Sequence, residues 1–288
     1  MMAYNTLIVL LGTSVLGIAA GITGVFLLLR KRSLLSDAVS HATLPGIAAG
    51  FLVALALGLD DGRHLPTLLA GAALSGILGA ASVQWLKDRT RLSEDAAIGV
   101  VLSSFFGLGI VMLSYIQTLG TGSRAGLDSF LLGQTAALTR EETALTALMA
   151  LAVIVVALSL RKELTLLCFD PVFTAASGWP LQKMDMILMG LMLAVVCTGL
   201  KTVGLILVIA LLIIPAATAR LWTDRLSLML FLAPLTGGTS AASGALISAH
   251  FTSIPAGAMI VLTATLFLAA GFLFSPVHGI LIRRRAQA

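Results

Sequence analysis

The sequence contains very little charge. Only 11% of its 288 residues are Asp, Glu, Lys or Arg, whereas 58% are hydrophobic. A soluble domain is about a quarter charged, so this composition excludes a soluble globule and indicates an integral membrane protein. Its apolar runs are continuous and helix-length, unlike the alternating strands of a membrane barrel. We therefore expect an all-α polytopic bundle, because membrane helices satisfy their backbone hydrogen bonds internally.

Cysteine and nucleotide-binding motifs are also scarce. The two cysteines, Cys168 and Cys197, lack the spacing of a metal site or disulfide, and we interpret them as ordinary small apolar residues. The stretch 199–202 reads Gly-Leu-Lys-Thr but lacks the earlier glycine of a phosphate-binding loop. The sequence thus predicts a chain that is not an enzyme, with any ATP hydrolysis carried by a partner chain.

The charges that remain lie at the ends of the apolar segments. Basic clusters are expected to stay in the cytoplasm, which places the N-terminus outside and the C-terminus inside. This position of the net charge of +5 is a topology signal and gives no indication of nucleic-acid binding. The expected inner basic positions are 30–32, 87–91, 161–162, 183, 220–225 and 283–285, against Arg63, Arg124, Arg140 and Lys201 outside.

Nine membrane spans follow from this pattern, and we expect them to form a single permease domain over residues 1–288. The first is interpreted as a retained span and not as a cleaved signal peptide, because it is too long and lacks a basic start. The predicted spans are about 5–29, the next segment to 59, then 65–86, 94–116, 143–160, 186–200, 202–221, 226–251 and 255–274.

Two segments are ambiguous, so eight or ten membrane spans are alternatives to nine. Residues 127–138 are apolar but too short to span, and Lys201 alone separates the sixth and seventh segments. On the inner side, 163–185 is the longest polar connection. Within it Asp170-Pro171 predicts the start of a short helix at 172–177. In the third segment, the four-residue spacing of Gly71, Ser75 and Gly79 predicts a close helix–helix seam.

A narrow polar stripe marks the second segment. Asp37 and His41 lie one turn apart on one helix face, together with Ser33, Ser36 and Ser40. An ionisable group at a membrane helix centre costs roughly 2.5–3.5 kcal/mol, so such groups are functional by default. A carboxylate and an imidazole suit a first-row divalent cation. The alternative is that Asp37 caps or orients the helix while His41 pairs with it.

Two ligands are too few for tight binding, but a carrier needs only moderate affinity because the ion must leave again. In a two-fold dimer the pair would become four ligands facing a central pathway. The remaining histidines, His64, His250 and His278, lie singly near segment ends. We interpret them as residues without a special role, although His64 and His250 on the outer side leave ion reception as an alternative.

Four stretches, 33–46, 169–173, 203–219 and 254–257, resemble the membrane permease subunit of ABC importers for manganese, zinc or iron. The resemblance implies a multi-pass protein of the bacterial inner membrane without a permanently bound cofactor. Its implied partners are ABC ATPase subunits, an extracytoplasmic metal-binding protein and a second permease copy or paralogue. It also implies that Asp37 and His41 line the ion path.

Coupling to the ATPase is expected through an inner loop, by analogy with related permeases. The first candidate loop, 215–226, contains Pro215, Ala216, Arg220, Asp224 and Arg225. The second candidate, 170–178, begins with Asp170 and Pro171. A transporter driven by an ion gradient is an alternative, but the internal repeats and midplane acids of that class are not found. A second alternative is a siderophore or cobalamin permease. Such a protein would need no metal-ligand pair, so the presence of Asp37 and His41 argues against it. The metal itself and the identity of the second permease stay open.

Overall fold

The computed structural model describes residues 2–59, 64–119, 138–251, 254–277 and 279–280, and over these residues the chain is helical without strands. Nine helices in the described ranges are long and apolar enough to cross a membrane. The predicted all-α bundle with about nine spans is therefore confirmed. The described part of 127–138 is only its last residue, so the question raised by that segment lies outside the described residues.

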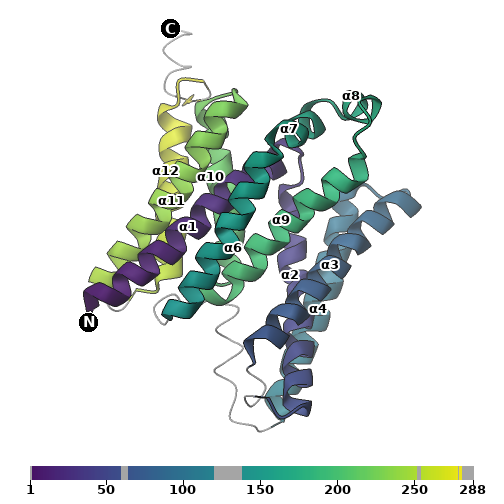
Figure 1. Ribbon diagram of the computed structural model, residues 1–288, viewed down its shortest axis with the longest axis vertical. Coiled ribbons are helices and arrows are strands. Elements are labelled where there is room, and N and C mark those ends of the chain that lie inside the picture. The colour runs from purple at the N-terminus through teal and green to yellow at the C-terminus, as the bar shows by residue number, and fades with distance from the viewer. Residues whose placement is uncertain (1, 60–63, 120–137, 252–253, 278, 281–288) are drawn as a thin grey trace. The chain divides into compact units, whose positions relative to one another are not determined.

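Two compact units make up the chain, one formed by residues 1–33 with 132–288 and the other by 34–131. Figure 1 shows the helices of both. The second unit contains three helices, namely α2 (Ser33–Ala56), α3 (Leu65–Arg89) and α4 (Glu94–Thr118). The first unit contains α1 (Met2–Leu29), α6 (Arg140–Ser159), α7 (Arg161–Phe169), α8 (Pro171–Ala176), α9 (Leu181–Thr202), α10 (Leu205–Trp222), α11 (Leu226–His250) and α12 (Ala256–Phe274).

Within the first unit, α1 is the central helix. It packs against α11, α6, α10 and α9. The approach to α11 is close because both helices carry glycine at the crossing: a methyl group on Gly17 would lie 2.5 Å from the carbonyl oxygen of Gly237. Small residues permit such backbone approach, which replaces the hydrophobic driving force that is missing in lipid.

The second unit uses the same device between α2 and α3. A methyl group on Gly46 would overlap the carbonyl oxygen of Gly71, and one on Gly79 would overlap the side chain of Ala42. Between these contacts the Ser75 hydroxyl donates a 2.6 Å hydrogen bond to the carbonyl of Ala42. The seam predicted from the four-residue spacing in α3 is therefore confirmed, and it fixes α3 along the helix that carries the polar stripe.

The polar connection 163–185 contains more helix than expected. Residues 161–169 form α7, which the sequence reading treated as loop, and α9 begins at Leu181, five residues before the predicted start. Charged residues hid α7, whose Leu164 and Leu167 are completely buried. The start signal at Asp170 is confirmed, because its carboxylate accepts a 2.8 Å hydrogen bond from the amide of Phe173 at the start of α8.

The sixth and seventh spans are two separate helices. After α9 ends, Val203 and Gly204 make a tight turn before α10. Gly204 has φ of +85°, a conformation that favours glycine.

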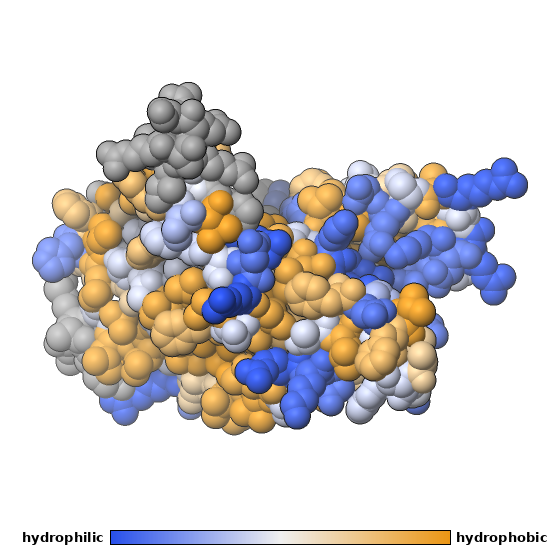
Figure 2. Space-filling view, turned by 90° about the horizontal axis from the view of Figure 1, so that it is seen from above, coloured by the Kyte–Doolittle hydropathy of each residue, from blue (hydrophilic) through white to orange (hydrophobic). Residues whose placement is uncertain are grey.

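Basic helix ends of the first unit lie at one end of that unit. Leu28, Arg220 and Phe272 line one groove of about 550 Å³, so the last turns of α1, α10 and α12 are neighbours. Arg30 reaches Leu167 of α7, which places the segment 161–162 near the same end. Figure 2 looks onto the end that carries α7 and α8, where hydrophilic residues stand in groups among hydrophobic ones. Arg30 and Arg220 therefore lie at the same end of the first unit.

Candidate metal-binding site

Helix α2 brings the two predicted ligands together. The chain leaves α1 through a turn in which Lys31 has φ of +59°, and α2 then starts at Ser33. Asp37 and His41 lie one turn apart on α2, with 3.4 Å between Asp37 Oδ1 and His41 Nε2. Their side chains are 37% and 23% exposed, respectively. The two side chains that the sequence placed on one helix face therefore do lie together, and both are partly exposed.

The surroundings of His41 leave one of its nitrogens without a protein partner. Its ring packs edge-on against Phe106 of α4, with 4.9 Å between the ring centres. Its Nδ1 is buried and has no hydrogen-bond partner among the described residues, and the same holds for the hydroxyl of the neighbouring Ser40. An unpaired buried polar atom costs about 1–3 kcal/mol. A further hydrogen-bond or coordination partner would remove this cost.

The donor chemistry fits a divalent transition metal. A carboxylate oxygen with an imidazole nitrogen accommodates manganese, zinc and iron(II), whereas calcium and magnesium prefer oxygen ligands alone. No group of three or more His, Cys, Asp or Glu side chains occurs in the described part of the chain. Among those described residues, Asp37 and His41 remain two candidate ligands that lie together on one helix.

The residues of the first candidate coupling loop divide into buried and exposed groups. Pro215 and Ala216 are buried inside α10. Beyond them Arg220 and Asp224 form an exposed ion pair of 2.9 Å, and Arg225 is exposed at the start of α11. Only the exposed three can touch a soluble partner directly.

The second candidate loop presents apolar side chains to solvent. Asp170 caps α8, and Pro171 is its first residue. Around them Val172 is 80% exposed and Phe173 is 55% exposed, in a helix that is not one of the candidate membrane spans. Sequence reasoning placed a short helix there but missed this exposed apolar surface. The sequence feature that could have revealed this surface is the run Phe-Asp-Pro-Val-Phe at 169–173. Its apolar residues do not follow the helical spacing of a buried face.

The other histidines stay apart from the pair. His64 precedes α3 and His250 ends α11, and neither belongs to a cluster of metal-ligand type in the residues described. His278 lies outside those residues. Glu94 stands in the first turn of α4 and forms an ion pair of 2.5 Å with Lys87.

Comparison with known proteins adds the family. The model of the ABC 3 transport family matches residues 2–275, nearly the whole chain. The chain belongs to the ABC 3 transport family. The two metal-ligand candidates and both candidate coupling loops lie inside the matched range.

Two proteins that this chain resembles are named for metal transport. The manganese transport system membrane protein MntC of Bacillus subtilis is 42% identical over 276 residues, which are 96% of this chain and 62% of the relative. This chain therefore spans less than two thirds of that protein. The zinc transport system membrane protein TroC of Treponema pallidum is 38% identical, and the match covers 96% of this chain and 91% of TroC.

A solved structure of PsaBC from Streptococcus pneumoniae in complex with Fab has the same fold. The match has a TM-score of 0.80 with 33% sequence identity, and it covers 96% of this chain and 94% of that one. The family match and the structural match thus both cover almost the full length of the chain.

Proposed function

We propose that this chain is the permease subunit of an ATP-driven importer that moves a divalent transition metal into the cytoplasm. The observation that carries the proposal is the Asp37–His41 pair on α2 of an ABC 3 family chain, open at one side and short of ligands. The names of MntC and TroC, which refer to manganese and zinc transport, support the same substrate class.

The metal is the cargo and binds transiently. Manganese, zinc and iron(II) all fit one carboxylate and one imidazole. The open side of the pair and the unpartnered Nδ1 of His41 support a half-site that a second copy or a related permease completes. Moderate affinity then follows from two weak halves and allows release.

An ABC ATPase is the proposed motor, and α8 is the surface that we propose for its docking. Val172 and Phe173 expose large apolar side chains outside the membrane spans, as expected of a surface that a soluble protein covers. The turn with Arg220, Asp224 and Arg225 becomes the second candidate, since Pro215 and Ala216 are buried. This order reverses the one that the sequence suggested.

The remaining assignments follow from the same proposal. Both units act as one transmembrane permease domain in the bacterial inner membrane. An extracytoplasmic binding protein delivers the ion on the side opposite the basic helix ends. No group is bound permanently.

The test is uptake into proteoliposomes that contain the permease, its ATPase and the binding protein. Uptake of Mn²⁺, Zn²⁺ or Fe²⁺ is expected to require ATP and to survive ionophores that collapse ion gradients. Uptake that survives without ATP and stops with the ionophore would instead indicate a gradient-driven transporter. Uptake of a siderophore or cobalamin without free metal would move the protein to that class.

A further inference from the structure

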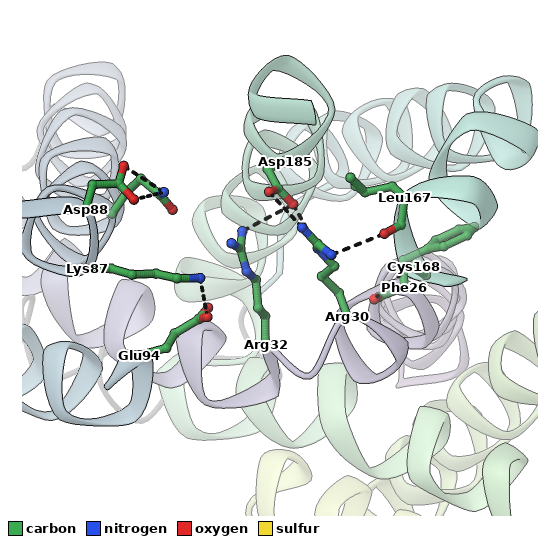
Figure 3. Close-up of polar contacts among 10 residues, drawn as sticks. Phe26, Arg30, Arg32, Lys87, Asp88, Glu94, Leu167, Cys168 and Asp185 are labelled. Atoms are coloured by element: carbon green, nitrogen blue, oxygen red, sulfur yellow. Dashed lines mark hydrogen bonds and ion pairs between the residues drawn. The ribbon is translucent and has the colours of Figure 1, made fainter. Parts of the chain in front are cut away.

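A polar cluster at the end of α1 connects three parts of the first unit. The guanidinium of Arg30 binds Asp185 of α9 through two parallel hydrogen bonds, Nε to Oδ1 at 3.1 Å and Nη2 to Oδ2 at 3.2 Å. Its remaining Nη1 donates to the carbonyl of Leu167 in α7 at 3.2 Å. Figure 3 shows Arg30 between these two partners. One planar side chain thus holds α7 and α9 together, a geometry that lysine cannot reproduce.

A second arginine reinforces the same carboxylate. Arg32 Nη1 lies 3.3 Å from Asp185 Oδ1, and the Arg32 side chain is only 6% exposed. The thiol of Cys168 lies beside this cluster, 3.7 Å from the carbonyl of Phe26, and burial raises its pKa to about 11. The side chains of Arg30 and Asp185 are 19% and 16% exposed. The cluster is therefore largely shielded from solvent, where charge-assisted pairs keep their strength.

The cluster joins the helices around α8 to the residues just before α2. Leu167 lies in α7, four residues before α8, and Asp185 lies in α9, nine residues after it, so the cluster holds the two helices that flank the short exposed helix. On the other side, Arg32 is followed at once by α2, and Asp37 comes five residues later. Four residues of chain thus separate Arg32 from the first metal-ligand candidate.

We propose that Arg30, Arg32 and Asp185 are positioning residues that couple α8 to the start of α2. We call these three residues the coupling clamp. The inference rests on the proposed function, in which α8 docks the ATPase and α2 carries the metal-ligand pair Asp37 and His41. A displacement of the flanks of α8 pulls on the clamp and moves the first turn of α2, because the clamped turn is only three residues long. The clamp touches neither the ion nor the nucleotide.

The test measures ions transported per ATP hydrolysed in proteoliposomes with the ATPase and binding protein. Asp185→Asn keeps the shape of the side chain but removes its charge. Arg30→Gln removes the guanidinium group that makes the two parallel hydrogen bonds. Both are expected to lower the ratio roughly tenfold, the order of one lost charge-assisted contact. ATP hydrolysis by the assembled complex is expected to continue. Arg30→Lys keeps the charge and should fall between these variants and the wild type.

Lys31→Gln is the matched control. It removes the same unit of charge from the same basic triplet, but Lys31 is exposed and has the same backbone strain with either residue. Its ratio is expected to stay within twofold of the wild type. Recovery of the complex by purification through the ATPase measures assembly in every variant.

The outcomes separate the possibilities. A merely structural clamp would lower uptake and hydrolysis in proportion to the amount of complex, leaving their ratio unchanged, and that result would overturn the inference. An equal loss of the ratio in Lys31→Gln would also overturn it, because charge alone would explain the effect. Failure of the wild-type complex to take up metal would overturn the proposed function itself, and the inference with it.

Discussion

Two polar clusters, one built on the α1–α2 turn and the other on α2, differ in how completely their atoms are used. In the clamp, Arg30 donates three hydrogen bonds, and the carboxylate of Asp185 contacts the guanidinium groups of two arginines. In the α2 pair, a single 3.4 Å contact joins Asp37 to His41, and His41 Nδ1 has no partner in the described residues. A filled cluster holds elements in place, whereas an unfilled one can accept a ligand and release it.

This difference teaches how charge is tolerated in so apolar a chain. Part-buried charges are costly unless they are paired and hydrogen-bonded. The clamp reduces that cost with protein groups alone. The pair leaves part of it in place, which a divalent cation and a second set of ligands would offset. The predictions below change one cluster and use the other as reference.

The largest effect is expected from removing either ligand. Asp37→Ala or His41→Ala should lower metal uptake by about a hundredfold or more, because a lost ligand is worth on the order of 3 kcal/mol or more. Assembly with the ATPase should persist. Uptake at limiting metal concentration is the measurement, and Asp88→Asn, an exposed acid of the same unit that binds Gln84, is the control. Normal uptake by both ligand variants would remove the site assignment.

The rate of thiol alkylation should differ between the clamp and the Asp37–His41 pair. Since burial raises the pKa of Cys168 from 9.0 to about 11, its thiolate fraction at pH 8 is about a hundredfold below that of an unshifted thiol. Cys168 is expected to react slowly with iodoacetamide and faster as the pH rises towards 11.

The comparison residue for this measurement is a thiol at the open pair. Asp37→Cys, in a chain where both native cysteines are replaced by serine, is expected to react faster than Cys168, because burial raises the pKa of Cys168 to about 11 whereas the side chain at position 37 is 37% exposed. Unfolded protein gives the reference rate for each thiol. Equal rates for the two folded variants would contradict the difference in packing.

Helix contacts around the pair should be sensitive to a single methyl group. Gly46→Ala is expected to destabilise the second unit by roughly 1–3 kcal/mol, because the new methyl meets the backbone of Gly71 and cannot be relieved by a rotamer change. Gly107→Ala on α4 adds the same methyl where nothing lies within 4 Å and should not destabilise it. Thermal unfolding in detergent compares the two, and similar midpoints would speak against the α2–α3 seam.

The smallest effect expected is on stability when each cluster loses one charge. Asp185→Asn should cost about 2 kcal/mol, because two arginines lose their shared part-buried carboxylate. Asp37→Asn should change stability by less than about 0.5 kcal/mol, since its pair is loose and more exposed. Chemical denaturation in detergent gives the ranking. A greater loss for Asp37→Asn would reverse the roles assigned here.

Much of the fold and the pairing of Asp37 with His41 could be predicted because their signals are local. Span length and apolar composition predict the membrane helices, and the i,i+4 spacing places Asp37 beside His41 on one helix face. The cap at Asp170 is similarly local. Such features need no knowledge of tertiary packing.

The clamp could not be predicted, since Arg30 and Asp185 are 155 residues apart in the chain. The sequence showed Arg30 only as part of a basic topology signal, which is satisfied wherever the guanidinium points. Helix α7 was missed because its charged residues mask the two buried leucines, Leu164 and Leu167. Long-range pairing and the burial of isolated apolar residues depend on packing that spacing alone does not carry.

The central claim is that Asp37 and His41 form half of a shared ion site. The most direct measurement uses complexes that contain one wild-type permease and one Asp37→Ala, His41→Ala permease, purified through two different tags. If the two halves form one site, ATP-driven metal uptake should fall below about a tenth of the wild-type rate, as expected when half of the ligands are lost. If each permease carries its own independent site, uptake should stay near half of the wild-type rate, and that result would contradict the claim.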